Sequence, residues 1–173
     1  MAESGFGLSA PDGPPCPATG LTPKQKQAMV DSWAAVCQNK KQNGVDLFIA
    51  FFSAYPAYQD KFELLRGLSI EELKTTPKLR AHASAVMFSI SSIVSNLDDP
   101  ECLVEVVKKT ANNHYNRGIT PLQFEHLKGV ILDFLGSKLG SRYDSLTSGA
   151  WEASLSLVNK VVADTMAQRD KES

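Results

Sequence analysis

The chain is short of cysteine and has no excess of charge of either sign. Its 173 residues include three cysteines, 18 basic residues and 19 acidic residues, so the formal net charge is −1 at pH 7. A balanced charge gives no field that would steer the molecule to nucleic acid, and we expect no nucleic-acid partner. Cys16, Cys37 and Cys102 lie far apart without a CxxC pair. This pattern argues against a disulfide framework and a zinc ribbon, and it favours a reducing compartment.

Long apolar runs and targeting signals are also missing. No segment approaches the roughly 18 apolar residues of a membrane span. The N-terminus lacks the basic start and the apolar run of a secretory signal, and Ala2 excludes the Met-Gly start that myristoylation requires. We therefore expect a soluble, cytoplasmic protein without a membrane partner.

Proline and glycine, in contrast, are concentrated at one end of the chain. Residues 1–20 hold four of the nine prolines and four of the eleven glycines, a composition that cannot join a packed helix or strand. We predict a flexible tail over residues 1–20, one domain over residues 21–168 and a polar tail over residues 169–173. A domain of about 150 residues buries roughly two thirds of its unfolded surface, which is enough for independent folding.

Strand patterns are absent, and helical patterns fill the predicted domain. No stretch alternates apolar and polar residues with period two over the length of a strand. Apolar residues recur instead at steps of three and four, and pairs such as Thr22-Pro23 are typical of helix starts. We predict an all-α domain of seven or eight helices. The expected helices begin near Pro23, Asn43, Pro56, Ser69, Pro77, Pro100, Pro121 and Leu146, and the last ends near Gln168.

Two of the three histidines lie on the apolar stripes of different predicted helices. The turn signal Asp98-Asp99-Pro100 joins these helices, so they should fold back on each other as a hairpin. At about 1.5 Å of rise per residue, His82 and His114 both lie roughly 20 to 25 Å from the turn. The spacing predicts a paired, inward-facing site that clamps a flat cofactor. The stripe of His82 is Leu79, Val86, Ile90, Ile93 and Leu97, and that of His114 is Leu103, Val107 and Ala111.

Two inward histidines are also compatible with a structural role or with a different metal. A helical domain can bury either histidine for purely structural reasons. However, stripes of valine, isoleucine and leucine offer few partners, and an unsatisfied buried polar group costs about 1 to 3 kcal/mol. Iron ligation together with a bound diatomic ligand removes this cost. A zinc or non-haem iron site is less favoured, because neither stripe carries a carboxylate.

Five features of the sequence occur in one register. They are Trp33 in the first predicted helix, Gly44 in the second, and the runs FFSAYPAYQDKF, KLRAHASAVM and NNHYNRGIT. In this order and spacing, the chain resembles the globin family over residues 21–168. The runs NKKQNGVDLF and SNLDDPECLVEVVKKTANNH are most similar to molluscan intracellular haemoglobins and myoglobins. The resemblance implies a globin fold around a pocket for haem b.

The resemblance also implies roles for individual residues. It makes His114 the proximal iron ligand and His82 the distal histidine, which ligates the iron directly only in a hexacoordinate state. Phe62 is expected to pack flat against the porphyrin, and Val86 to line the ligand pocket. The residues that the resemblance places at the cofactor are Phe48, Phe62, Leu65, His82, Val86, Thr110, His114, Arg117, Ile119 and Phe124.

Three further side chains have two interpretations each. Phe48 either supplies helix-packing bulk or crowds the iron with the positive edge of its ring toward the ligand. Arg117 either complements a helix C-terminus or pairs with a haem propionate. For His126, a structural or surface role is favoured over a role in the site.

The chain departs from the family pattern at three positions. Thr110 stands where better-known members carry a bulky apolar residue, which predicts looser packing beneath the haem. Ala85 cannot supply the basic group that often meets a propionate at its position. Leu65 replaces the second pocket phenylalanine of vertebrate myoglobins. These departures bear on haem affinity and exchange, but none of them removes an iron ligand.

The implied function is reversible binding of dioxygen and other diatomic ligands at ferrous haem, for storage or transport and without enzymatic activity. A neutral imidazole suits haem iron as an axial base, and a distal N–H can donate to dioxygen within a dry pocket. The combination of Phe48, His82 and Val86 resembles neuroglobin-type proteins and suggests an alternative. This is a bis-histidyl, hexacoordinate globin with a redox, nitric oxide or nitrite, or sensing role. Association into a homo-oligomer is left open by the sequence.

Overall fold

The computed structural model describes residues 12–172, and the regular structure within them is entirely helical. This confirms the predicted all-α fold class. Within these residues, no helix combines the length and the apolar character needed to cross a membrane. The α-helices are α1 (Pro23–Cys37), α2 (Lys40–Ala54), α3 (Ile70–Thr75), α4 (Pro77–Ser95), α5 (Pro100–Tyr115), α6 (Pro121–Leu139) and α7 (Ser145–Glu172). The 3-10 helices are η1 (Pro56–Lys61), η2 (Glu63–Leu65) and η3 (Gly140–Arg142).

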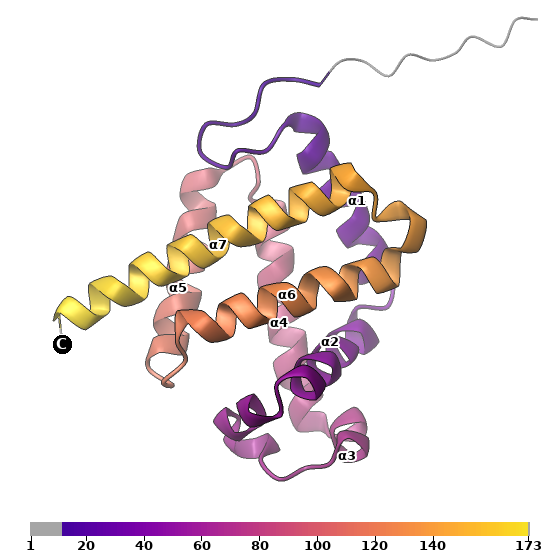
Figure 1. The fold of residues 1–173 in the computed structure, drawn as a ribbon, viewed down its shortest axis with the longest axis vertical. Coiled ribbons are helices and arrows are strands. Elements are labelled where there is room, and N and C mark those ends of the chain that lie inside the picture. The colour runs from indigo at the N-terminus through magenta and orange to yellow at the C-terminus, as the bar shows by residue number, and fades with distance from the viewer. Residues whose placement is uncertain (1–11, 173) are drawn as a thin grey trace, which may run out of the picture.

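The helices cross one another in two layers. In Figure 1, α6 and α7 run side by side across the front of the view, and α4 and α5 cross behind them. The chain turns between α4 and α5 at Asp99, whose carboxylate caps α5 by accepting a hydrogen bond from the backbone N–H of Cys102 at 3.1 Å. The hairpin predicted for these two helices is confirmed.

Helix starts follow the capping signals in the sequence. At α1, the hydroxyl of Thr22 accepts a hydrogen bond from the backbone N–H of Gln25, and the side chain of Gln25 accepts one from the backbone N–H of Thr22. Ser69 and Glu72 form the same reciprocal pair at α3. These pairs satisfy backbone donors that a helix start leaves without partners, so the local sequence fixes where each helix begins.

Two helices extend beyond their predicted ends. α2 begins at Lys40, about one turn before the predicted start at Asn43, and α7 continues to Glu172. The added turns are mostly polar and exposed, so they carry no apolar stripe. Much of the segment predicted as a polar C-terminal tail is therefore the last turn of α7.

The segment before α1 packs in part against the domain. Asp12 accepts hydrogen bonds from the backbone N–H groups of Gly13 at 2.9 Å and Lys24 at 3.1 Å, and the backbone N–H of Cys16 donates to the carbonyl of Leu21. Thr19 is buried. Residues 1–11 lie outside the described residues, so the flexible tail over residues 1–20 stays a prediction.

A close crossing of α2 over α4 sets the position of the helix that carries His82. A methyl group added to Gly44 would meet Cγ of Met87 at 2.9 Å and Cβ of Ala83 at 3.3 Å. Real Cβ atoms essentially never make contacts under 3.0 Å, so the two backbones approach this closely because residue 44 has no side chain. The crossing brings Phe48, one turn further along α2, against the ring of His82.

Candidate functional site

One cavity collects most of the residues that the sequence singles out. It has a volume of about 590 Å³, within the range typical of small-molecule and cofactor sites. Its walls come from α2, η1, η2, α4, α5, α6 and the loop before α6. Nine of the ten predicted site residues line it: Phe48, Phe62, Leu65, His82, Val86, His114, Arg117, Ile119 and Phe124.

His82 reaches the cavity from the second turn of α4 and is held there by aromatic rings. The ring centroids of Phe48 and Phe62 each lie 4.9 Å from the imidazole, and both phenyl rings meet it edge to face at 76°. Within residues 12–172, no hydrogen-bond partner of the His82 imidazole is found. Burial lowers the pKa of His82 to about 4, and electrostatic interaction with nearby His114 and Arg117 acts in the same direction. The imidazole is therefore neutral at pH 7.

His114 lies in the last turn of α5 and is held by the backbone. Its Nδ1 lies 2.8 Å from the carbonyl oxygen of Thr110, one helical turn earlier. A carbonyl oxygen can only accept a hydrogen bond, so Nδ1 must carry the proton. Burial lowers the pKa of His114 despite this hydrogen bond, and the ring is neutral at pH 7. Its Nε2 therefore has a free lone pair, which is the form that ligates a metal ion.

Thr110 is the one predicted site residue that the cavity walls leave out. Its hydroxyl donates a hydrogen bond to the carbonyl of Val106 at 3.1 Å, within α5. The contribution of Thr110 to the site is its backbone carbonyl, which orients the ring of His114. Sequence reasoning considers the side chain at position 110, whereas in the structure the backbone carbonyl, which every residue has, contacts His114.

Basic side chains line the cavity beside the apolar ones. Arg117 does so while its Nη1 donates a hydrogen bond at 2.8 Å to the carbonyl of Asn113, near the C-terminus of α5. Both interpretations of Arg117 therefore retain a structural basis. Lys61 and Lys78 also line the cavity, and sequence reasoning missed them. Lys78 precedes His82 by four residues, and this helical spacing could have identified it.

An aromatic group continues from the cavity toward α6. Phe51 and Tyr58 line the cavity, and the hydroxyl of Tyr58 lies 2.6 Å from Nδ1 of His126. Tyr55 stacks on the imidazole of His126 with ring centroids 4.3 Å apart. Sequence reasoning missed this group, although positions 51, 55 and 58 follow the helical steps of four and three. The structural role expected for His126 is compatible with these contacts.

The residues present suit a metal that is already chelated by another molecule, and they do not suit a bare metal ion. Within residues 12–172 there is no cluster of three or more histidine, cysteine, aspartate or glutamate side chains suited to hold a bare metal ion. The cavity instead offers one oriented imidazole, a second imidazole, apolar walls and basic groups. This donor set fits a flat metal chelate with acidic substituents, such as a haem.

Comparison with known proteins agrees with this geometry. The family model described as "Globin" matches residues 45–162. A "Globin" of Nerita albicilla is 30% identical over 142 residues, covering 82% of this chain and 90% of that protein. "Hemoglobin-3" of Phacoides pectinatus is 33% identical over 153 residues, covering 88% of this chain and 99% of that protein. Both relatives are molluscan, which confirms the narrower resemblance seen in the sequence.

A solved structure supports the fold. The hexacoordinated heme protein of an anhydrobiotic tardigrade, determined at pH 4, superposes with a TM-score of 0.82. The superposition covers 88% of this chain and 99% of the tardigrade chain, at 18% sequence identity. At this identity the likeness shows a shared arrangement of helices and nothing about the ligands of the iron.

Proposed function

Because the chain belongs to the globin family, we propose that it is a haem b protein that binds dioxygen reversibly at ferrous iron, for storage or transport. One observation carries the proposal. The backbone carbonyl of Thr110 holds a neutral His114 so that Nε2 keeps a free lone pair, and His82 lines the same cavity without a hydrogen-bond partner in residues 12–172. Such a pair suits an axial base on one side and a hydrogen-bond donor on the other.

When bound, the haem supplies an iron atom with one coordination position for a diatomic ligand. His114 would hold the iron, and Phe62 would pack against the porphyrin. Lys61, Lys78 and Arg117 line the cavity and can pair with the carboxylates of the haem. Three basic groups at the cavity offset the absence of one at Ala85.

The distal wall is suited to protect a polarised ligand. The N–H of His82 can donate to the partial negative charge of dioxygen, and the hydrogen bond gains strength where water is excluded. Phe48 and Leu65 are each 2% exposed and line the same cavity, so they keep solvent from the ligand. This environment favours release of neutral dioxygen over loss of superoxide.

A second function is favoured because no hydrogen bond within residues 12–172 ties down the imidazole of His82. Its ring is neutral and is held by edge contacts with phenyl rings, so a small shift of α4 would let its nitrogen ligate the iron in the absence of gas. The protein would then be a bis-histidyl globin with a redox, nitric oxide or nitrite, or sensing role.

The visible absorption spectrum of the ferrous, deoxygenated protein separates the two functions. One broad visible band is expected for an open coordination position, whereas sharp split bands would indicate two axial histidines. The His82→Leu variant is the control, because its spectrum must show the broad band in either case. A purified chain that stays colourless after incubation with haemin would refute both functions.

A further inference from the structure

A tyrosine and a histidine outside the two iron-ligand positions form a short hydrogen bond beside the cavity. The hydroxyl oxygen of Tyr58, in η1, lies 2.6 Å from Nδ1 of His126, in α6. Both side chains are half-buried, and Tyr58 lines the cavity. When His126 is neutral with its proton on Nε2, the phenol donates to Nδ1. A proton acceptor is thus already within transfer distance of a phenol that borders the site.

Neighbouring rings hold this pair in place. Tyr55 stacks on His126 with an interplanar angle of 5°, and it also stacks on Tyr58 with ring centroids 5.4 Å apart. Phe51 lies 5.6 Å from Tyr58, between centroids, and itself lines the cavity. Rings from α2, η1 and α6 therefore fix the position of the phenol relative to the imidazole.

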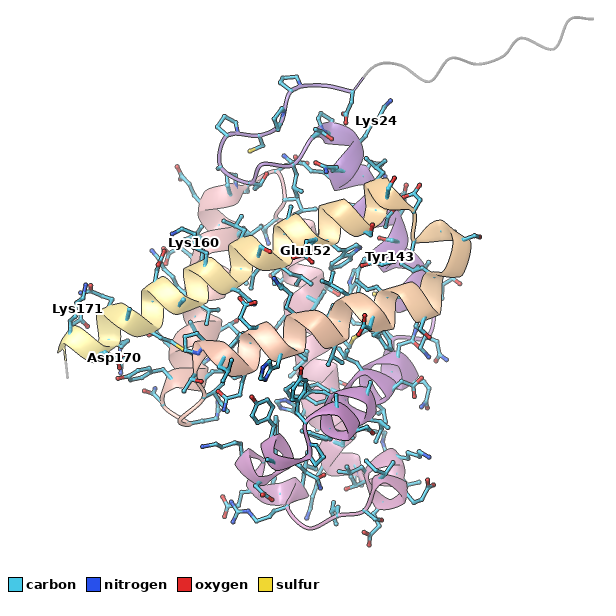
Figure 2. All side chains as sticks on the ribbon, viewed as in Figure 1. Lys24, Tyr143, Glu152, Lys160, Asp170 and Lys171 are labelled. Carbon is cyan, nitrogen blue, oxygen red and sulfur yellow. The ribbon has the colours of Figure 1, made fainter. Side chains whose placement is uncertain are left out.

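The surroundings of the other tyrosines make Tyr58 distinctive. All four tyrosines lie within residues 12–172, and Tyr58 alone among them lines the cavity. Tyr115 donates a hydrogen bond at 2.8 Å to Asp170, which lies near the end of α7 (Figure 2). Tyr143 lies beyond the C-terminus of α6 (Figure 2), whereas His126 is the sixth residue of that helix, near its N-terminus. A position at the cavity wall shortens the distance over which Tyr58 would pass an electron to the site.

We propose that Tyr58 is a redox-active tyrosine that reduces the haem site after the site has reacted with a hydroperoxide, and that His126 takes its proton. The inference rests on the proposed haem function. Hydrogen peroxide accepts two electrons, and two protons from the buffered solvent, so that both of its oxygen atoms reach the oxidation level of water. One electron comes from the haem group and the other from Tyr58. The phenolic O–H bond breaks, its proton passes to Nδ1 of His126, and a neutral tyrosyl radical and an imidazolium remain.

The proton acceptor decides whether this oxidation is feasible. Removing an electron from a phenol that keeps its proton leaves a strongly acidic radical cation, which is an unfavourable product in a half-buried position. Transfer of the proton across the existing hydrogen bond avoids this charge on the ring. Because the two atoms are already 2.6 Å apart, little rearrangement precedes the transfer. Tyr58 and His126 would thereby reduce the oxidised site before it damages the haem.

Electron paramagnetic resonance of the haem-loaded ferric protein, frozen soon after mixing with hydrogen peroxide, tests the proposal. A tyrosyl radical signal is expected in the unaltered protein, and Tyr58→Phe should remove most of it. Tyr143→Phe is the matched control, because it deletes a hydroxyl outside the cavity, and it should leave the signal unchanged. A signal of unchanged size in Tyr58→Phe would overturn the proposal, as would its loss in Tyr143→Phe alone.

His126→Gln tests the role of the proton acceptor. A glutamine carbonyl still accepts the hydrogen bond of Tyr58 but takes up no proton, so the structural bond is kept and the proton transfer is lost. We expect the radical to form about a hundredfold more slowly, the lower end of what a positioned proton acceptor contributes. Equal rates in both proteins would refute proton transfer to His126. Far-ultraviolet circular dichroism and the haem absorption band verify that each variant is folded and loaded.

The two proposals fail in different ways. A chain that binds no haem would refute the proposed function and this inference together. A chain that shows the haem absorption band and binds dioxygen, but gives no tyrosyl signal with peroxide, would refute only the redox role of Tyr58.

Discussion

The two walls of the cavity present the same side chain, an imidazole, but hold it in different ways. The ring of His114 is fixed by a hydrogen bond from Nδ1 to a backbone carbonyl, which determines both its orientation and its tautomer. The ring of His82 rests between Phe48 and Phe62, and these contacts determine its position but neither its tautomer nor a hydrogen bond. His114 is therefore the fixed imidazole, with its orientation and tautomer set in advance, and His82 is the responsive imidazole, whose tautomer is free to follow what enters the cavity.

The packing around each imidazole differs in the same sense. On the side of His82, the close crossing of α2 and α4 leaves Phe48 only 2% exposed. On the side of His114, the ring meets Phe124 at 5.2 Å, and the exposed Arg117 follows three residues later. The ring of His82 is thus packed against two phenyl rings, whereas the ring of His114 is packed against one.

Removing the fixed imidazole should have the largest effect. His114→Ala deletes the axial base, and we expect the variant to lose haem during gel filtration. Added imidazole should restore binding, because the deletion leaves space for it. The ratio of haem absorbance to protein absorbance measures retention. His82→Ala is the matched control and should retain haem. Equal haem loss in the two variants would show that His82 and His114 contribute equally to haem retention.

Removing the responsive imidazole should alter the ligand more than the cofactor. His82→Leu should retain haem but release dioxygen about 10 to 100 times faster, because a hydrogen bond to a charged group contributes about 1.5–3 kcal/mol. It should also oxidise faster in air. Stopped-flow mixing and the decay of the oxygenated spectrum measure the two rates. If both rates matched those of the unaltered protein, His82 would have no part in stabilising the ligand.

Disturbing the crossing of α2 and α4 should affect the distal wall selectively. Gly44→Ala forces a methyl group against Met87 and Ala83, so we expect the free energy of unfolding to fall by about 1 to 3 kcal/mol. Gly129→Ala in α6 is the control, since a methyl group there meets nothing within 4 Å. It should stabilise the protein by up to about 1 kcal/mol, through helix propensity. Urea denaturation measures both changes.

The functional readout of Gly44→Ala sharpens the contrast between the walls. A shift of α4 should change the rate of dioxygen release, which depends on His82, more than the rate of haem loss, which depends on His114. A variant that lost haem quickly but released dioxygen normally would show that the crossing supports the side of His114 and not the side of His82.

Much of this contrast could be predicted from sequence, and part of it could not. Apolar spacing predicted that His82 and His114 face inward, because a helical stripe is a local property of the chain. The start of α2 at Lys40 was missed, since a polar first turn carries no stripe. The contacts of Tyr58 with His126 were missed because they join residues 68 positions apart. No side-chain pattern could reveal the carbonyl of Thr110, which every residue at that position would offer.

The smallest effect is expected from the side chain of Thr110. Thr110→Val removes the hydroxyl that bonds to Val106 but keeps the backbone carbonyl that orients His114. If the carbonyl is the functional group, haem affinity should change by no more than about 0.5 kcal/mol, or roughly twofold in the rate of haem transfer to apomyoglobin. A rise of tenfold or more, approaching the effect of losing an outer-shell partner of a metal ligand, would place the side chain in the site after all. The position of His114 would then depend on the side chain of Thr110, just as the position of His82 depends on the side chains of Phe48 and Phe62.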